Sequence, residues 1–151
     1  MATKQISTTR FGVIDVDVDE LIDLPDGLLG FVSVDQVALV PVDQDGLFFW
    51  MQAVNDPAVA FLVLTPWPLF ADYELDLAEA DQEALGIDHA GDAIVFCLLT
   101  SHDKPRRFTA NLLGPVVINR KLRKGRQVVL NGDHPTQAEL PGLGSGSNGV
   151  T

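Results

Sequence analysis

The chain has 151 residues, a net charge of −11 and 46% hydrophobic residues, which is the size and composition of one folded domain. The N-terminus lacks the apolar stretch of a secretory signal, and the longest apolar runs hold seven residues, whereas a membrane-spanning helix needs about 20. The only cysteine, Cys97, cannot form an internal disulfide, so the composition excludes a disulfide scaffold and favours a soluble protein in a reducing, cytoplasmic compartment.

The first half of the chain reads as strands separated by turns. Apolar residues alternate with aspartates over Ile14–Asp19, which predicts a half-buried strand with an acidic outer face. Turn residues follow at Leu24–Gly27. The runs Val37–Val42 and Leu47–Val54 predict a hairpin, because Asp43-Gln44-Asp45-Gly46 joins them and ends in Asp-Gly. Pro41 places the first run at a sheet edge or at its own end.

The middle of the chain contains another apolar strand and the best helix candidate. Asn55-Asp56-Pro57 predicts a turn that leads into a strand at Ala58–Leu64. Pro66 and Pro68 then exclude a central strand, because proline has no N–H to donate. Leu77–Leu85 predicts a short helix, with Gly86 as its C-terminal stop.

Four further runs predict strands in the second half, with a turn at Lys124-Gly125 between the last two: Ala93–Leu99, Arg106–Ala110, Val116–Asn119 and Gln127–Leu130. Short strands with little helix predict a mainly β, single-domain, antiparallel barrel-like sheet with one or two short helices. We expect this domain to span residues 1–140. The Gly- and Ser-rich residues 141–151 predict a flexible tail.

No residue pattern predicts catalysis, a cofactor or a metal. Asp15-x-Asp17-x-Asp19 lacks the glycine and the glutamate that a calcium loop of the EF-hand type requires at its sixth and twelfth positions. The three histidines each lack a second ligand at zinc-binding spacing. Cys97 lies inside an apolar run, which predicts a buried thiol rather than a nucleophile. We expect that the chain is not an enzyme.

Charge is segregated along the chain. Nineteen of the 21 acidic residues lie between Phe11 and Asp103, where Lys and Arg do not occur, and eight of the ten basic residues lie between Lys104 and Arg126. Two interpretations of the basic segment 120–126 stay open. Nearby acidic strands balance it, or it binds RNA phosphates as part of a small RNA-binding β-barrel. We expect no direct nucleic-acid binding, because the excess of negative charge repels a long polyanion.

Four motifs in order resemble those of the FliW family of flagellar assembly factors. They are Arg10-Phe11-Gly12, taken as the opening of the first strand; Leu24–Phe31; Phe49–Pro57 continuing through Ala60–Val63 to Asp72-Tyr73-Glu74; and Ala110–Asn119 followed by Arg123–Leu130. The likeness covers roughly residues 9–131.

The resemblance implies a cytoplasmic protein that binds other proteins. Members of the family bind flagellin and also the RNA-binding translational regulator CsrA, so that CsrA no longer represses translation of flagellin mRNA. On this resemblance we expect partner contacts at polar positions within the motifs: Asn55, Asp56, Asp72, Tyr73, Glu74, Asn119, Arg123 and Lys124.

Overall fold

The computed structural model describes residues 2–104 and 106–141. In this part of the chain it contains one α-helix, α1 (Glu79–Leu85), two short 3₁₀ helices (Val18–Glu20 and Ala90–Asp92) and eleven strands. The strands are β1 (Thr3–Thr8), β2 (Gly12–Asp17), β3 (Ile22–Asp23), β4 (Gln36–Pro41), β5 (Phe48–Ala53), β6 (Ala60–Leu64), β7 (Ala93–Asp103), β8 (Arg106–Ala110), β9 (Val116–Asn119), β10 (Lys124–Gln127) and β11 (Ala138–Glu139). The predicted mainly β fold is confirmed. The expectation for residues 142–151 of the tail lies outside the described residues.

One sheet closes on itself. Its strands follow the order β7-β6-β5-β4-β3-β10-β9, and β9 pairs back onto β7 through Ala93–Phe96, which makes a barrel. All pairings in the barrel are antiparallel except the contact between β10 and β3, where Lys124 lies opposite Asp23. The closure removes most free strand edges, because nearly every strand finds a neighbour on both sides.

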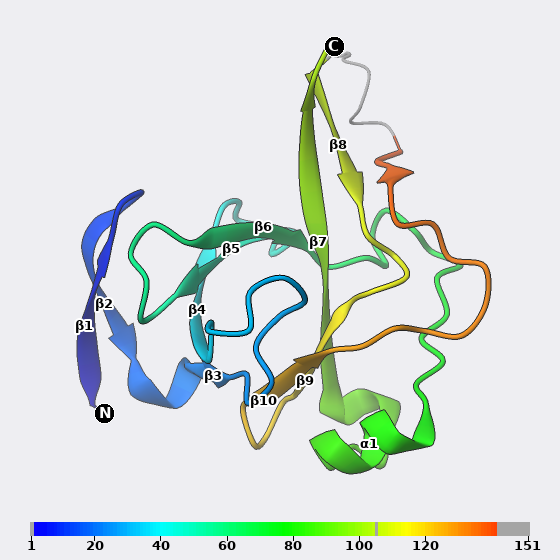
Figure 1. The fold of residues 1–151 in the computed structure, drawn as a ribbon, viewed down its shortest axis with the longest axis horizontal. Coiled ribbons are helices and arrows are strands. Elements are labelled where there is room, and N and C mark those ends of the chain that lie inside the picture. Colours follow the sequence, from blue (N-terminus) through cyan, green and yellow to red (C-terminus); the bar gives the residue numbers. More distant parts are fainter. Residues whose placement is uncertain (1, 105, 142–151) are drawn as a thin grey trace.

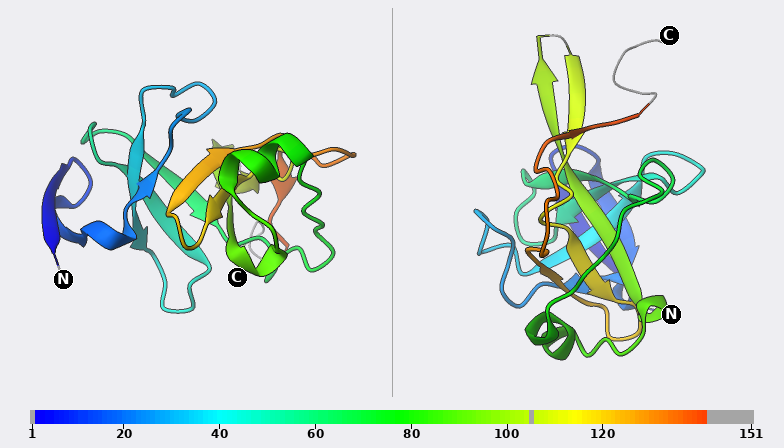
Figure 2. Two further views of the ribbon diagram at one scale, coloured as in Figure 1. Left: turned by 90° about the horizontal axis from the view of Figure 1, so that it is seen from below. Right: turned by 90° about the vertical axis from the view of Figure 1, so that its right-hand side faces the viewer.

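Two hairpins extend from the barrel (Figures 1 and 2). β7 is long enough to pair with β9 and β6 inside the barrel and then with β8 beyond it, and β11 adds to the outer side of β8. The hairpin of β1 and β2 forms a separate two-stranded sheet at the other side of the molecule. It packs through Ile6, Ile14 and Val16 against Ala38 of β4.

The buried side chains form two larger clusters on opposite faces of β6, β7 and β9, because alternate residues of these strands belong to different clusters. One surrounds Met51 and Val63, and the other surrounds Leu64 and Cys97. Because side chains of a strand alternate between faces, Met51 enters the core and Trp50 points the other way. Trp50 is therefore only half-buried although its strand is largely apolar, and the Arg10 guanidinium lies over its ring, 3.8 Å from the ring centroid.

Several predicted boundaries are confirmed. β8 and β9 match their predicted ranges, β4 ends at Pro41, and Gly86 caps α1 in the left-handed conformation with a φ of 68°. Gly27 also takes a positive φ, of 68°. These positions were predictable because each depends on the chain's own local chemistry.

Three predictions were wrong. Arg10-Phe11-Gly12 does not open the first strand: β1 precedes it, and its six residues are too polar to show a clear pattern. The strand of alternating aspartates stops at Asp17, whose carboxylate accepts from the Asp19 N–H at 2.9 Å and starts a 3₁₀ helix. Lys124 and Gly125 lie inside β10 rather than in a turn, so the strand predicted at Gln127–Leu130 starts three residues earlier and ends at Gln127. The turn residue with positive φ is Arg123, at 54°.

Candidate partner-binding site

The first group of expected contact residues forms the turn between β5 and β6. Asn55 and Asp56 are exposed there; the Asn55 amide donates to Asp35 Oδ1 at 2.7 Å, and Asp56 Oδ1 accepts from the Ala58 N–H at 3.2 Å. Beneath them the fully buried Gln52 donates through Nε2 to backbone oxygens of the same turn, including Val59 O at 3.2 Å. The turn is therefore rigid and presents its polar side chains to solvent.

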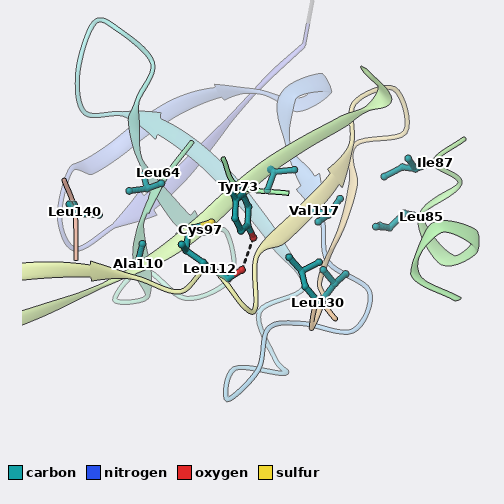
Figure 3. Close-up of a cluster of buried hydrophobic side chains, with 12 residues drawn as sticks. Leu64, Tyr73, Leu85, Ile87, Cys97, Ala110, Leu112, Val117, Leu130 and Leu140 are labelled. Carbon is teal, nitrogen blue, oxygen red and sulfur yellow. Dashed lines mark hydrogen bonds between the residues drawn. The ribbon is translucent and has the colours of Figure 1, made fainter. Parts of the chain in front are cut away.

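The second group lies in the loop between β6 and α1. Tyr73 is only 8% exposed, and its hydroxyl donates to Leu112 O at 2.6 Å (Figure 3). Trp67 Nε1 donates to Tyr73 O at 2.8 Å. Burial raises the pKa of the Tyr73 phenol above its usual value, so the hydroxyl stays protonated. Tyr73 anchors the loop and holds its exposed neighbours Asp72 and Glu74 in solvent.

The third group lies at the turn between β9 and β10. Asn119 is 4% exposed. Its Nδ2 donates to Leu85 O at 2.8 Å, and its Oδ1 accepts from the N–H groups of Lys121 and Leu122 at 2.9 and 3.0 Å. One side chain thus ties the C-terminus of α1 to the turn that reverses the chain toward β10.

The two basic members of this group are half-buried. Arg123 donates through Nη2 to Glu20 O at 2.8 Å, and Lys124 lies opposite Asp23 in β3. The structure brings Asn119, Arg123 and Lys124 together. It leaves the β5–β6 turn beside the β1–β2 hairpin, where the Thr9 N–H donates to Pro57 O at 2.8 Å, and the loop between β6 and α1 on the other side of the barrel (Figure 1). The eight residues do not form one patch.

Acidic groups accompany part of the basic segment. Arg126 lies between two carboxylates, 3.7 Å from Asp26 and 3.6 Å from Asp81, and outside the segment Arg107 lies 3.4 Å from Glu139. These pairs are partly exposed and contribute little stability individually. They do lower the positive potential that the segment presents to solvent.

Sequence reasoning missed two surfaces. The loop after Gly27 carries exposed apolar side chains, those of Leu29 (64% exposed), Phe31 (45%) and Val32 (79%), which no residue pattern indicated. A groove between β2 and β4 brings the aspartates of β2 beside Leu39 and Pro41. The alternation of aspartates gave one side of that groove. The other side depends on pairing between distant segments, which no local pattern reveals.

Cys97, His102 and His134, which we considered as candidates for catalysis or metal binding, are buried or contact other side chains of the fold. Cys97 is fully buried, as predicted, and burial raises the pKa of its thiol to about 12, although a hydrogen bond with Tyr73 partly opposes this. His102 Nε2 lies 3.0 Å from Thr109 Oγ1, and the His134 ring packs edge-on against Tyr73. Among the described residues, no three His, Cys, Asp or Glu side chains gather as metal ligands would. No helix in that part of the chain has the length and apolarity needed to cross a bilayer.

These features define a small β-barrel protein of one sheet, with an added N-terminal hairpin and polar side chains displayed on rigid turns. A sequence profile described as "FliW protein" matches residues 4–140. The chain therefore belongs to the FliW family of flagellar assembly factors.

Individual relatives agree with this assignment. The chain is 36% identical over 138 residues to the flagellar assembly factor FliW of Magnetococcus marinus, covering 91% of this chain and 85% of that protein. It is 38% identical to the FliW of Moorella thermoacetica, with 85% and 82% covered, and 35% identical to that of Bacillus subtilis, with 83% and 88% covered. A crystal structure of the flagellar assembly factor FliW superimposes with a TM-score of 0.82 at 32% identity, covering 93% of this chain and 99% of that one.

Proposed function

We propose that this chain acts in the cytoplasm as a protein-binding regulator and chaperone. It binds flagellin, and it binds the translational regulator CsrA, so that CsrA no longer represses translation of flagellin mRNA. The observation that carries this proposal is membership of the FliW family along almost the whole chain. Binding of proteins, and no catalysis, is the activity that we assign to it.

The charge of the chain supports an RNA-binding protein as partner. A net charge of −11 attracts a basic protein and repels the phosphates of the RNA that this protein binds. Binding of this chain to CsrA therefore opposes binding of RNA to CsrA. Asp72 and Glu74 are exposed on a loop that Tyr73 holds in place, which suits them to act on the approach of such a partner.

Association kinetics with purified CsrA test this role of charge. The variant Asp72→Asn/Glu74→Gln changes the net charge from −11 to −9, and we expect slower association with little change in dissociation. The variant Asp45→Asn/Asp133→Asn removes the same charge from two other exposed positions and serves as the control. If the association rate of the wild type does not change between about 0.05 and 0.5 M salt, electrostatic steering is excluded, because the Debye length shortens strongly over that interval.

Titration of a labelled single-stranded leader RNA tests the proposal against direct RNA binding. We expect no binding by this chain alone at low salt, and release of RNA from a preformed CsrA complex when the chain is added. Micromolar binding by the chain alone that is lost in Lys121→Ala/Lys124→Ala, with a slope of about −0.7 in log affinity against log salt per phosphate contacted, would contradict the proposal.

A further inference from the structure

A groove of about 350 Å³ runs between the β1–β2 hairpin and the edge of β4. Asp15 and Asp17 of β2, with Glu20 of the following 3₁₀ helix, give it an acidic wall, and Leu39, Pro41 and Phe49 of β4 and β5 give it an apolar floor. Leu39 and Phe49 pack at the margin of the barrel core. The groove thus combines an apolar floor with an acidic wall.

The floor includes a strand edge without a neighbouring strand. β3 pairs with β4 only at Ile22 opposite Val37 and Asp23 opposite Gln36. The residues before β3 belong to the 3₁₀ helix Val18–Glu20, so the ladder stops before it reaches Leu39. β4 therefore has β5 on one side along its length, and the groove on the other side from Leu39 onward.

The register shows which backbone groups point into the groove. In an antiparallel pair, alternate residues direct both N–H and C=O toward the same neighbour. The Val42 N–H donates to Phe48 O across the hairpin, so Val40 and Ala38 also face β5. Leu39 faces the groove with a donor and an acceptor, and Pro41 faces it with a carbonyl. Such an edge is a template for an added strand.

The charged groups of the groove favour a cationic occupant. Three carboxylates, those of Asp15, Asp17 and Glu20, line it together with one guanidinium, that of Arg123. Arg123 already donates through Nη2 to Glu20 O, although its buried Nε has no hydrogen-bond partner in the described structure. A segment that carries lysine or arginine beside the β2 wall would balance the excess of carboxylates.

We propose that this groove binds an extended, basic segment of a protein partner, which adds a strand to the edge of β4. Side chains of a strand alternate between faces, so the segment places apolar residues on Leu39 and Phe49 and cationic residues toward Asp15 and Asp17. A second copy of this chain, with its charge of −11, is a poor occupant, and residues 142–151 contain no Lys or Arg. The inference rests on the proposed function in taking the occupant to be a protein.

Peptide titration into the full-length ¹⁵N-labelled chain tests the groove directly. The probe is a capped Lys-Val-Lys-Val-Lys-Val peptide. We expect amide shifts at Asp15 and Leu39 and slower hydrogen exchange of the Leu39 N–H, because the added strand supplies the acceptor that this group lacks. A peptide with Glu in place of Lys, and one N-methylated at alternate amides, should both fail to bind. Binding by the N-methylated peptide, or no response at Leu39, would overturn the proposal.

Paired variants separate local from global charge. Asp15→Asn/Glu20→Gln removes two groove carboxylates and should weaken peptide binding by about fivefold at low salt. Asp17 is left intact because its carboxylate caps the 3₁₀ helix. Glu83→Gln/Asp133→Asn, at exposed positions outside the groove, makes the same change in net charge and should leave the affinity almost unchanged. Equal weakening by both pairs would refute a groove site.

Binding of purified CsrA and flagellin distinguishes this inference from the proposed function. If the wild type binds at least one of them and Asp15→Asn/Glu20→Gln binds it several-fold more weakly than the control pair does, the groove is a partner site. If the wild type, Asp15→Asn/Glu20→Gln and the control pair all bind the partner with equal affinity, the groove inference is wrong and the proposed function stands. If the wild type binds neither protein, the proposed function is wrong, and the response of Leu39 to the peptide alone decides the inference.

Discussion

Replacing Gly27 by alanine should destabilise the fold by more than a usual Gly→Ala change. Gly27 has a φ of 68°, where a side chain costs about 1–2 kcal/mol. An added Cβ would also lie 2.5 Å from Val32 Cα and from Val32 O, both backbone atoms. The loop must then shift, which strains the β-bridge between Leu28 and Phe31 and partly exposes the buried Leu28. Full burial of a leucine side chain stabilises a fold by about 1.5–3 kcal/mol, and part of this is lost. We expect a total loss of about 3 kcal/mol.

The same loop provides a matched control. Gly30 also has a positive φ, of 82°, but an added Cβ there meets no atom within 4 Å. Gly30→Ala should therefore lose only the conformational part, about 1–2 kcal/mol. Urea denaturation followed by far-UV circular dichroism, with unchanged m-values, gives both free energies. If Gly27→Ala loses no more than Gly30→Ala, the close approach to Val32 has no energetic consequence and the reasoning fails.

Three other predictions concern two buried side chains, those of Asn119 and Cys97. Asn119→Ala should lower the free energy of unfolding by about 2–4 kcal/mol, because it leaves buried backbone groups at the end of α1 and in the β9–β10 turn without hydrogen-bond partners. Thermal and urea unfolding curves that match those of the wild type would contradict this role. Burial raises the pKa of the Cys97 thiol from 9.0 to about 12, so its contribution to stability is complete below pH 9 and is lost as the pH rises toward 12. Cys97→Ala should lose less stability than the wild type across that interval, and equal losses would show that Cys97 does not titrate there. In the folded wild type at pH 7, the thiol should react with a disulfide reagent only as fast as the protein unfolds, and immediate labelling would contradict its burial.

Features that depend on neighbours in sequence were predictable from the residues alone. The limits of β8 and β9 matched their predicted ranges, Asp45-Gly46 predicted the β4–β5 hairpin, and Gly86 predicted the end of α1. Each is set by local backbone preferences or by a short period of apolar residues. The motifs in their order also gave the family.

Only the tertiary structure decided which polar residues face solvent and where the barrel closes. Tyr73 and Asn119 sit in motifs that suggested partner contacts, yet each is buried because a distant segment offers its hydrogen-bond partners, Leu112 for one and Leu85 for the other. Gly125 suggested a turn. It lies instead in β10, where a Cβ would lie 3.0 Å from the Ile118 side chain and 3.1 Å from the Leu24 side chain, so packing across strands leaves little room for a larger residue. The groove beside β4 likewise exists because β3 stops after two residues, and where a ladder stops is fixed by contacts between distant segments.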